Sequence, residues 1–172
     1  MSKRALKKYL TELNKEQLEE QVLDLYQRFK EVKSYYNFVF NPKEDKLLEE
    51  AKVKISLEYF PSGKRRKVKM RRSIAQKYIK QFIQLGVDPV LILDFMLYNI
   101  ELGQAFSKNR YISQETFFRS MFKSFEEAYD FANNNVIFRD AFGRFEKIVN
   151  ESLEQDWFNK VAFERVFYPD VD

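Results

Sequence analysis

The 172-residue sequence contains no histidine and no cysteine. Their absence removes the commonest general base near neutral pH, the catalytic thiol, and metal sites built on imidazole or thiolate. The absence of cysteine also excludes disulfides and leaves the redox compartment of the protein undetermined. An enzyme built on this chain would have to work with carboxylates, lysine, tyrosine, serine or threonine. We expect no metal and no cofactor.

Glycine and proline are scarce, with four of each. So few breakers leave little turn chemistry for a many-stranded fold and favour helices. Long hydrophobic runs are missing too, because the longest one, residues 90–100, is interrupted by Asp94 and is too short to cross a bilayer. The basic N-terminus is followed by no apolar segment and does not read as a secretory signal. These features predict a cytoplasmic protein without a membrane span.

Apolar and aromatic residues are abundant: 45% of the chain is hydrophobic, with 18 Phe and 10 Tyr. This composition suits a sizeable core and is not typical of a disordered chain. Helical spacing recurs along the sequence, for example in a helix that Asn14 caps and whose apolar face continues to Val32. We predict an all-α fold, a single domain over residues 1–172, built as a helical bundle or short helical solenoid of about six to eight helices.

Positive charge is concentrated in one part of the chain. Residues 1–58 carry a net charge of +1 and residues 88–172 a net charge of −6, ending in a short acidic tail at 168–172. The segment 59–87 between them has no acidic residue, and such a local concentration creates a potential that attracts anionic partners. Its nine basic residues are Lys64, Arg65, Arg66, Lys67, Lys69, Arg71, Arg72, Lys77 and Lys80.

The basic segment is predicted to form a loop up to about Lys69 and then a helix that ends at Gly86. At 100° per residue, the polar side chains of this helix share one face and its apolar side chains the other. Cations gather at the start of the helix, where the helix dipole makes each one unfavourable by about 0.3–1 kcal/mol unless an anion is present. The polar face consists of Arg72, Gln76, Lys77, Lys80 and Gln84.

Two interpretations of the basic segment remain open. Residues 64–80 could offer their cations to an acidic partner. Nucleic acid is the leading one, because cations supply affinity that does not depend on nucleotide sequence, and an acidic protein or a membrane surface is the other. Alternatively, the acidic C-terminal half folds against the segment and neutralises it without any ligand. No zinc finger or RNA-binding aromatic motif accompanies the basic residues.

A second candidate site lies in the most apolar predicted helix. Asp94 and Glu101 are seven residues apart and therefore share one face, about 10 Å apart along the axis. Carboxylates in apolar surroundings have raised pKa values and can act as acid and base. The alternative is an exposed polar stripe, or ion pairs with cations on other elements.

A third candidate is an aromatic patch near residues 35–40, formed by Tyr35, Tyr36, Phe38 and Phe40. Aromatic residues this close together cannot all face one core from a helix. Part of the patch is therefore expected either to meet a partner or a second subunit, or to pack irregularly beneath the turn that follows.

Four stretches of the sequence carry a resemblance to a known family. They are residues 3–10 (KRALKKYL), 14–21 (NKEQLEEQ), 40–48 (FNPKEDKLL) and 71–77 (RRSIAQK). The chain, to about Phe163, resembles an uncharacterised family of small bacterial proteins that is classed only as a domain of unknown function. The resemblance implies a bacterial cytoplasmic setting and brings no catalytic residue, cofactor or partner.

The sequence alone therefore predicts a non-enzymatic intracellular binding module that presents residues 64–80 to an acidic partner, with nucleic acid leading. The alternative is a protein–protein or self-association domain that uses the aromatic patch and could form a homo-oligomer. A carboxylate enzyme at Asp94 and Glu101 comes third.

Overall fold

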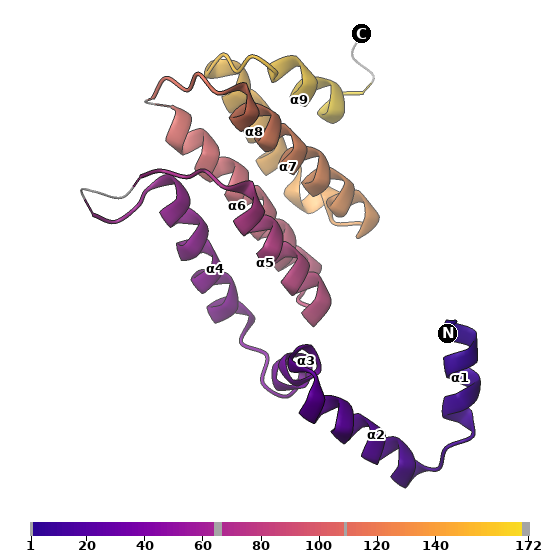
Figure 1. Ribbon diagram of the computed structural model, residues 1–172. Coiled ribbons are helices and arrows are strands. Elements are labelled where there is room, and N and C mark those ends of the chain that lie inside the picture. The colour runs from indigo at the N-terminus through magenta and orange to yellow at the C-terminus, as the bar shows by residue number, and fades with distance from the viewer. Residues whose placement is uncertain (1, 64–66, 109, 170–172) are drawn as a thin grey trace. The chain divides into compact units, whose positions relative to one another are not determined.

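The computed structural model describes residues 2–63, 67–108 and 110–169 (Figure 1). These residues form helices and no strands, which confirms the all-α prediction. The nine helices in these ranges exceed the six to eight expected. They are α1 (Lys3–Thr11), α2 (Lys15–Arg28), α3 (Lys30–Phe40), α4 (Glu44–Tyr59), α5 (Arg72–Leu85), α6 (Pro89–Ser107), α7 (Glu115–Asn134), α8 (Phe138–Glu154) and α9 (Lys160–Phe167).

One of the additional helices comes from a break that the sequence pattern did not indicate. A single helix was expected to run from the Asn14 cap to Val32, but the chain leaves the helical conformation at Phe29, with φ −114° and ψ 118°. The prediction of one continuous helix is therefore wrong. Neither glycine nor proline stands near Phe29, and the apolar spacing continues across it, so no local signal marked the break.

Other boundaries agree with the sequence signals. The Asn14 side chain accepts from the backbone N–H of Gln17, and the Gln17 side chain accepts from that of Asn14, which completes the expected capping box. Gly86 ends α5 in the left-handed region with φ 75°, where a side chain would be strained. Asp88 then caps α6, which begins at Pro89.

The chain divides into two compact units, Met1–Lys43 and Glu44–Asp172. The single domain expected from the sequence stays a prediction. In the first unit α2 packs against α3, where the rings of Tyr26 and Tyr36 lie 6.4 Å apart and the Tyr26 hydroxyl donates to Asn37 Oδ1 at 3.3 Å. None of the residues described in this unit is buried. The first unit therefore has no core of its own.

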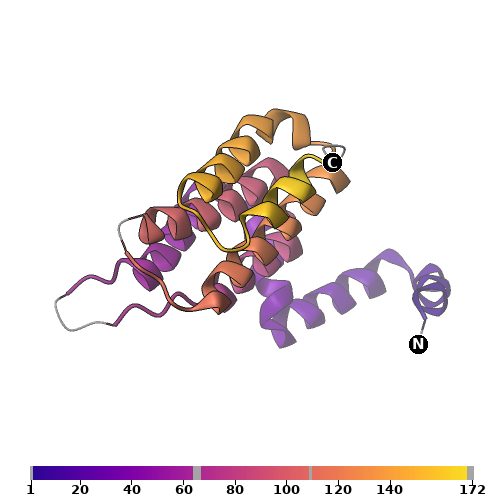
Figure 2. The same ribbon diagram turned by 90° about the horizontal axis from the view of Figure 1, so that it is seen from above.

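The second unit is organised around α6. This helix contacts α4, α5, α7 and α8, and in both views of the ribbon it runs alongside them (Figures 1 and 2). Eleven of its residues are buried, from Ile92 to Phe106. A helix that is apolar on nearly all sides is stable only when other helices surround it, and this arrangement is that of a bundle. Within the described ranges, no helix is both long enough and apolar enough to cross a bilayer.

Aromatic rings fill the part of the core between α7, α8 and α9. Phe125, Phe145 and Phe163 are fully buried, and the ring of Phe125 lies 5.6 Å from that of Phe145 and 4.9 Å from that of Phe163. Burying one such side chain contributes roughly 1.5–3 kcal/mol, and the packing of the rings adds to it. Phe142, on the same helix as Phe145, lies at the edge of this core and is 42% exposed.

Close packing of α6 on α7 depends on Gly103. A Cβ atom at this position would lie 2.5 Å from the sulfur of Met121 and 3.6 Å from the ring of Phe117, both of which are buried. The other glycine inside a helix, Gly143 in α8, is exposed and has nothing within 4 Å of its virtual Cβ. Both glycines lie in helices, and they differ in the room that is available for a side chain.

We expect Gly103→Val to lower the free energy of unfolding by about 1–3 kcal/mol, because the added side chain overfills the contact between α6 and α7. Gly143→Val is the matched control, since it makes the same change in an exposed helix and should alter stability by less than about 1 kcal/mol. Denaturant unfolding followed by circular dichroism measures both values. Equal losses in the two variants would contradict the role assigned to Gly103.

Candidate functional site

The described part of the basic segment contains Lys67, Lys69, Arg71, Arg72, Lys77 and Lys80, while Lys64, Arg65 and Arg66 lie outside the described residues, as do the last three residues of the predicted acidic tail. The described part of the predicted loop, residues 67–69, is not helical, and α5 begins at Arg72 and ends at Leu85 with the predicted Gly86 as its C-cap. Arg71 is the residue before the helix, and no side chain caps the free N–H groups of its first turn.

Arg71 is engaged by the end of α4. Its guanidinium donates two hydrogen bonds to the Glu58 carboxylate, at 2.8 and 2.7 Å, and the Glu58 carbonyl oxygen accepts from the backbone N–H groups of Lys69 and Met70. The hydrogen bonds from Arg71 lower the pKa of Glu58 although its partial burial acts in the opposite direction. A two-pronged contact of this kind fixes where the basic segment enters α5.

Arg72 is engaged by α7. Its guanidinium forms an ion pair with Glu127 and donates to the Ser124 hydroxyl at 3.1 Å, and Gln76 donates to the same Glu127 carboxylate at 2.9 Å. Glu127 belongs to the acidic C-terminal half, so the predicted internal neutralisation does occur at this position. Arg72 and Gln76 therefore face α7 rather than solvent, which corrects their assignment to the solvent-facing side of α5.

The remaining four lysines are free of such contacts. Lys67, Lys69, Lys77 and Lys80 are exposed, and none of them forms an ion pair with any residue that the structure describes. Ser73, Gln81 and Gln84 are exposed on the same helix as Lys77 and Lys80, and α5 contains no carboxylate. The outer face of α5 therefore offers ammonium, amide and hydroxyl groups with no acidic residue of its own.

The predicted carboxylate pair in α6 is held by cations from two other helices. Arg144 in α8 binds Asp94 at 2.6 Å and Glu101 through two hydrogen bonds of 2.9 Å, and Lys52 in α4 binds the other oxygen of Asp94 at 2.8 Å. The two carboxylates therefore form ion pairs with cations on other helices, which is one of the alternatives expected from the sequence. They link α4, α6 and α8 in one network.

The network also sets the acidity of Asp94. Burial alone would raise its pKa, but the hydrogen bonds from Lys52 and Arg144 outweigh burial and lower the pKa below its usual value. A general acid requires a raised pKa instead. Tyr98 completes the cluster: Lys52 Nζ lies 5.3 Å from its ring centre, and its hydroxyl lies 2.9 Å from that of Ser56. The geometry thus favours a structural role for the pair.

The four residues of the predicted aromatic patch differ in exposure. Tyr35 and Phe40 are exposed, the latter by 82%, whereas Tyr36 and Phe38 are half-buried. Tyr36 lies at the centre, with its ring 5.5 Å from that of Tyr35 and 6.2 Å from that of Phe40.

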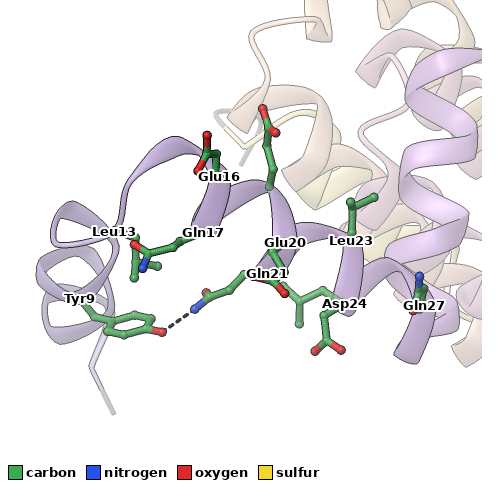
Figure 3. Close-up of a pocket in the computed structure, with 11 residues that line it drawn as sticks. Tyr9, Leu13, Glu16, Gln17, Glu20, Gln21, Leu23, Asp24 and Gln27 are labelled. Carbon is green, nitrogen blue, oxygen red and sulfur yellow. Dashed lines mark hydrogen bonds between the residues drawn. The ribbon is translucent and has the colours of Figure 1, made fainter.

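A feature that the sequence did not indicate is an open groove within the first unit, between α1 and α2 (Figure 3). Its volume is about 990 Å³. Tyr9 and Leu13 line it on one side, and the Tyr9 hydroxyl accepts a hydrogen bond from Gln21 across it. Four carboxylates and neither lysine nor arginine are among its lining residues: Glu16, Glu19, Glu20 and Asp24.

Sequence reasoning missed the partners of the charged residues as well. Each charged side chain of the candidate sites lies at least 13 positions along the chain from its partner: Arg71 from Glu58, Arg72 from Glu127, and Asp94 from Lys52 and Arg144. No local pattern joins residues so far apart, and only the packing of the helices brings them together.

The described residues thus define an all-helical protein whose second unit carries a lysine-lined helix face and a charged cluster that joins three helices. A sequence comparison adds its classification: the family described as "Family of unknown function (DUF6155)" matches residues 1–169, so the chain belongs to that family. No curated protein matches the chain, and no solved structure does.

We expect Arg144→Ala to lower the free energy of unfolding by about 1–3 kcal/mol, because it removes hydrogen bonds to two partly buried carboxylates. Solvent screening keeps the loss below that of a fully buried pair. Arg139→Ala is the matched control, because Arg139 is an exposed arginine of the same helix and should change stability by less than about 0.5 kcal/mol. If both variants unfold at the same denaturant concentration, the network contributes nothing measurable.

The lowered pKa of Asp94 predicts a pH dependence. A carboxyl group whose pKa is lower in the folded than in the unfolded chain contributes stability that is complete above about pH 4, near the unfolded value, and is lost as the pH falls through the folded value. The difference in unfolding free energy between wild type and Asp94→Asn should therefore shrink as the pH is lowered from 7 to 2. A constant difference across this range would contradict the prediction.

Proposed function

We propose that this protein is a non-enzymatic binding module that presents the lysine-bearing face of α5 and the loop before it to a polyanion, with nucleic acid as the leading partner. The single observation that carries the proposal is the composition of that surface. Lys67, Lys69, Lys77 and Lys80 are exposed, and α5 has no carboxylate that could neutralise them. Cations without internal partners bind the phosphates of nucleic acids whatever the nucleotide sequence.

The contacts of the two arginines support this proposal by fixing the surface rather than contributing to it. Arg71 is bound to Glu58 and Arg72 to Glu127, so the loop before α5 and the start of α5 are anchored to α4 and α7. A surface anchored in this way is ordered before its ligand arrives, which lowers the entropy lost on binding. The exposed amides of Gln81 and Gln84 can donate to phosphate or sugar oxygens beside the lysines.

The proposal is tested by fluorescence anisotropy with short generic RNA and DNA, titrated from about 50 to 200 mM salt. The test variant is Lys67→Gln/Lys69→Gln/Lys77→Gln/Lys80→Gln, which leaves Arg71 and Arg72 with their structural partners. We expect its affinity at low salt to fall at least about tenfold and its log–log salt slope to become shallower by about one for each lysine that contacts a phosphate.

A matched control separates a defined site from general charge. Lys30→Gln/Lys43→Gln/Lys123→Gln/Lys147→Gln removes the same charge from exposed lysines elsewhere and should bind nearly as wild type does. If the wild type binds neither nucleic acid at 50 mM salt, or if the two quadruple variants lose affinity equally, the proposed surface is wrong.

A second candidate function is favoured by Phe40, which is 82% exposed at the end of α3 and is linked to the exposed Tyr35 through the ring of Tyr36. Exposed aromatic residues of this kind mark protein–protein interfaces. In this case α3 would bind a protein partner or a second copy of the chain.

A further inference from the structure

The first unit needs a covering surface that it does not provide itself. α1 has nine residues, shorter than a helix that is stable alone in water, and none of the residues from Ser2 to Lys43 is buried. Its exposed apolar side chains form no core and lie along all three helices: Leu6, Tyr9, Val22, Leu23 and Leu25 on α1 and α2, and Tyr35, Val39 and Phe40 on α3.

The charge of α1 identifies what could cover it. The helix contains Lys3, Arg4, Lys7 and Lys8 and no acidic residue, and none of these cations forms an ion pair with a residue that the structure describes. At 100° per residue the cations lie on one side of the helix, and Leu6 and Tyr9 on the other. α1 is therefore a basic amphipathic helix whose cations form no ion pair with the described carboxylates of its own unit.

The groove between α1 and α2 has the complementary character. Its lining combines apolar side chains, among them Leu23 (Figure 3) and Leu25, with four carboxylates, of which Glu19 is paired with Lys15 and Asp24 with Arg28. Glu16 and Glu20 are one turn apart on α2, and neither forms an ion pair within the described ranges. An acidic groove with apolar side chains fits a basic amphipathic helix, which inserts its apolar residues and pairs its cations with the rim.

We propose that the occupant is a second copy of this chain, with α1 of each copy lying along the acidic groove on α2 of the other. One unit carries both the basic helix and the acidic groove, so a twofold arrangement satisfies both elements of both copies at once. Within a single copy, α1 forms one wall of the groove through Tyr9 and leaves its cations unpaired. The dimer buries the exposed leucines and pairs the two sets of charges.

The proposal concerns the first unit and is independent of the lysines proposed to bind nucleic acid. It is tested by multi-angle light scattering of the full chain at about 50 mM salt and at concentrations up to about 0.1 mM, where interfaces of micromolar Kd are filled. We expect a mass near twice 20.9 kDa. Lys3→Glu/Lys7→Glu and Glu16→Lys/Glu20→Lys should each shift the protein to the mass of one chain.

The decisive step is to mix these two variants in equal amounts. In the mixture the acidic α1 of one variant meets the basic groove of the other, and the reverse holds for the second contact, so a dimer should reappear. Recovery on mixing excludes loss of folding as the cause of dissociation. Nucleic-acid binding by the individual variants is read separately and should persist.

Matched controls place the same charge changes elsewhere. Lys30→Glu/Lys43→Glu and Asp130→Lys/Glu154→Lys alter exposed residues without ion pairs to described residues and should remain dimeric, as should Tyr35→Ser/Phe40→Ser. A wild type of one-chain mass, dimers that survive charge reversal, failure to recover on mixing, or dimers lost only in the aromatic variant would each overturn the proposal. The last result would assign the interface to α3 instead.

Discussion

The burial of α6 is the constraint on which the second unit depends. Its buried residues face four other helices, and a narrow stripe with Asp94, Tyr98 and Glu101 is half-buried. The surrounding helices can then be ordinary amphipathic ones, each with one apolar face and one polar face. The polar faces are consequently available for charges. They carry the lysines of α5 and the cations Lys52 and Arg144, which pair with the two carboxylates of α6.

The two charged sites differ in how completely their charges are paired. At the α4–α6–α8 network, the carboxylates of Asp94 and Glu101 meet Arg144, and Lys52 adds a second cation at Asp94. At α5 the two arginines are paired but the lysines are not. Arginine forms planar two-pronged contacts with carboxylates, whereas lysine is a compact and strongly hydrated charge. This difference explains why the arginines at α5 hold the structure together while its lysines are exposed.

Much of the fold could be predicted from the sequence because its signals are local. The capping box at Asn14, the glycine at 86 and the Asp88–Pro89 start each act within a few residues and were found where expected. The break at Phe29 could not be predicted, because neither the apolar spacing nor a breaker residue marks it. Phe117 and Phe118 show the same limit: the former is buried against α6 and the latter half-buried beside Trp157, a difference set by neighbouring helices.

The candidate sites were only half predictable for the same reason. The sequence located the basic residues and the two carboxylates of α6, but not Glu58, Glu127, Lys52 and Arg144, which decide what those residues can do. The groove between α1 and α2 was missed because it depends on the contact of Tyr9 with Gln21, twelve positions apart, which no local pattern marks. Long-range pairing, rather than secondary structure, is the information that a single sequence lacks.

The contacts of Glu58 with the residues before α5 hold together the two ends of the loop that joins α4 to α5. The Glu58 carbonyl accepts from Lys69 and Met70 and its carboxylate binds Arg71, while Met70 turns the chain with φ 48°. Closing a chain at its base makes the entropy of the fold depend only weakly on the number of residues between the closing contacts. The number of residues between Tyr59 and Lys69 can thus change among descendants of this sequence while the helical bundle stays the same.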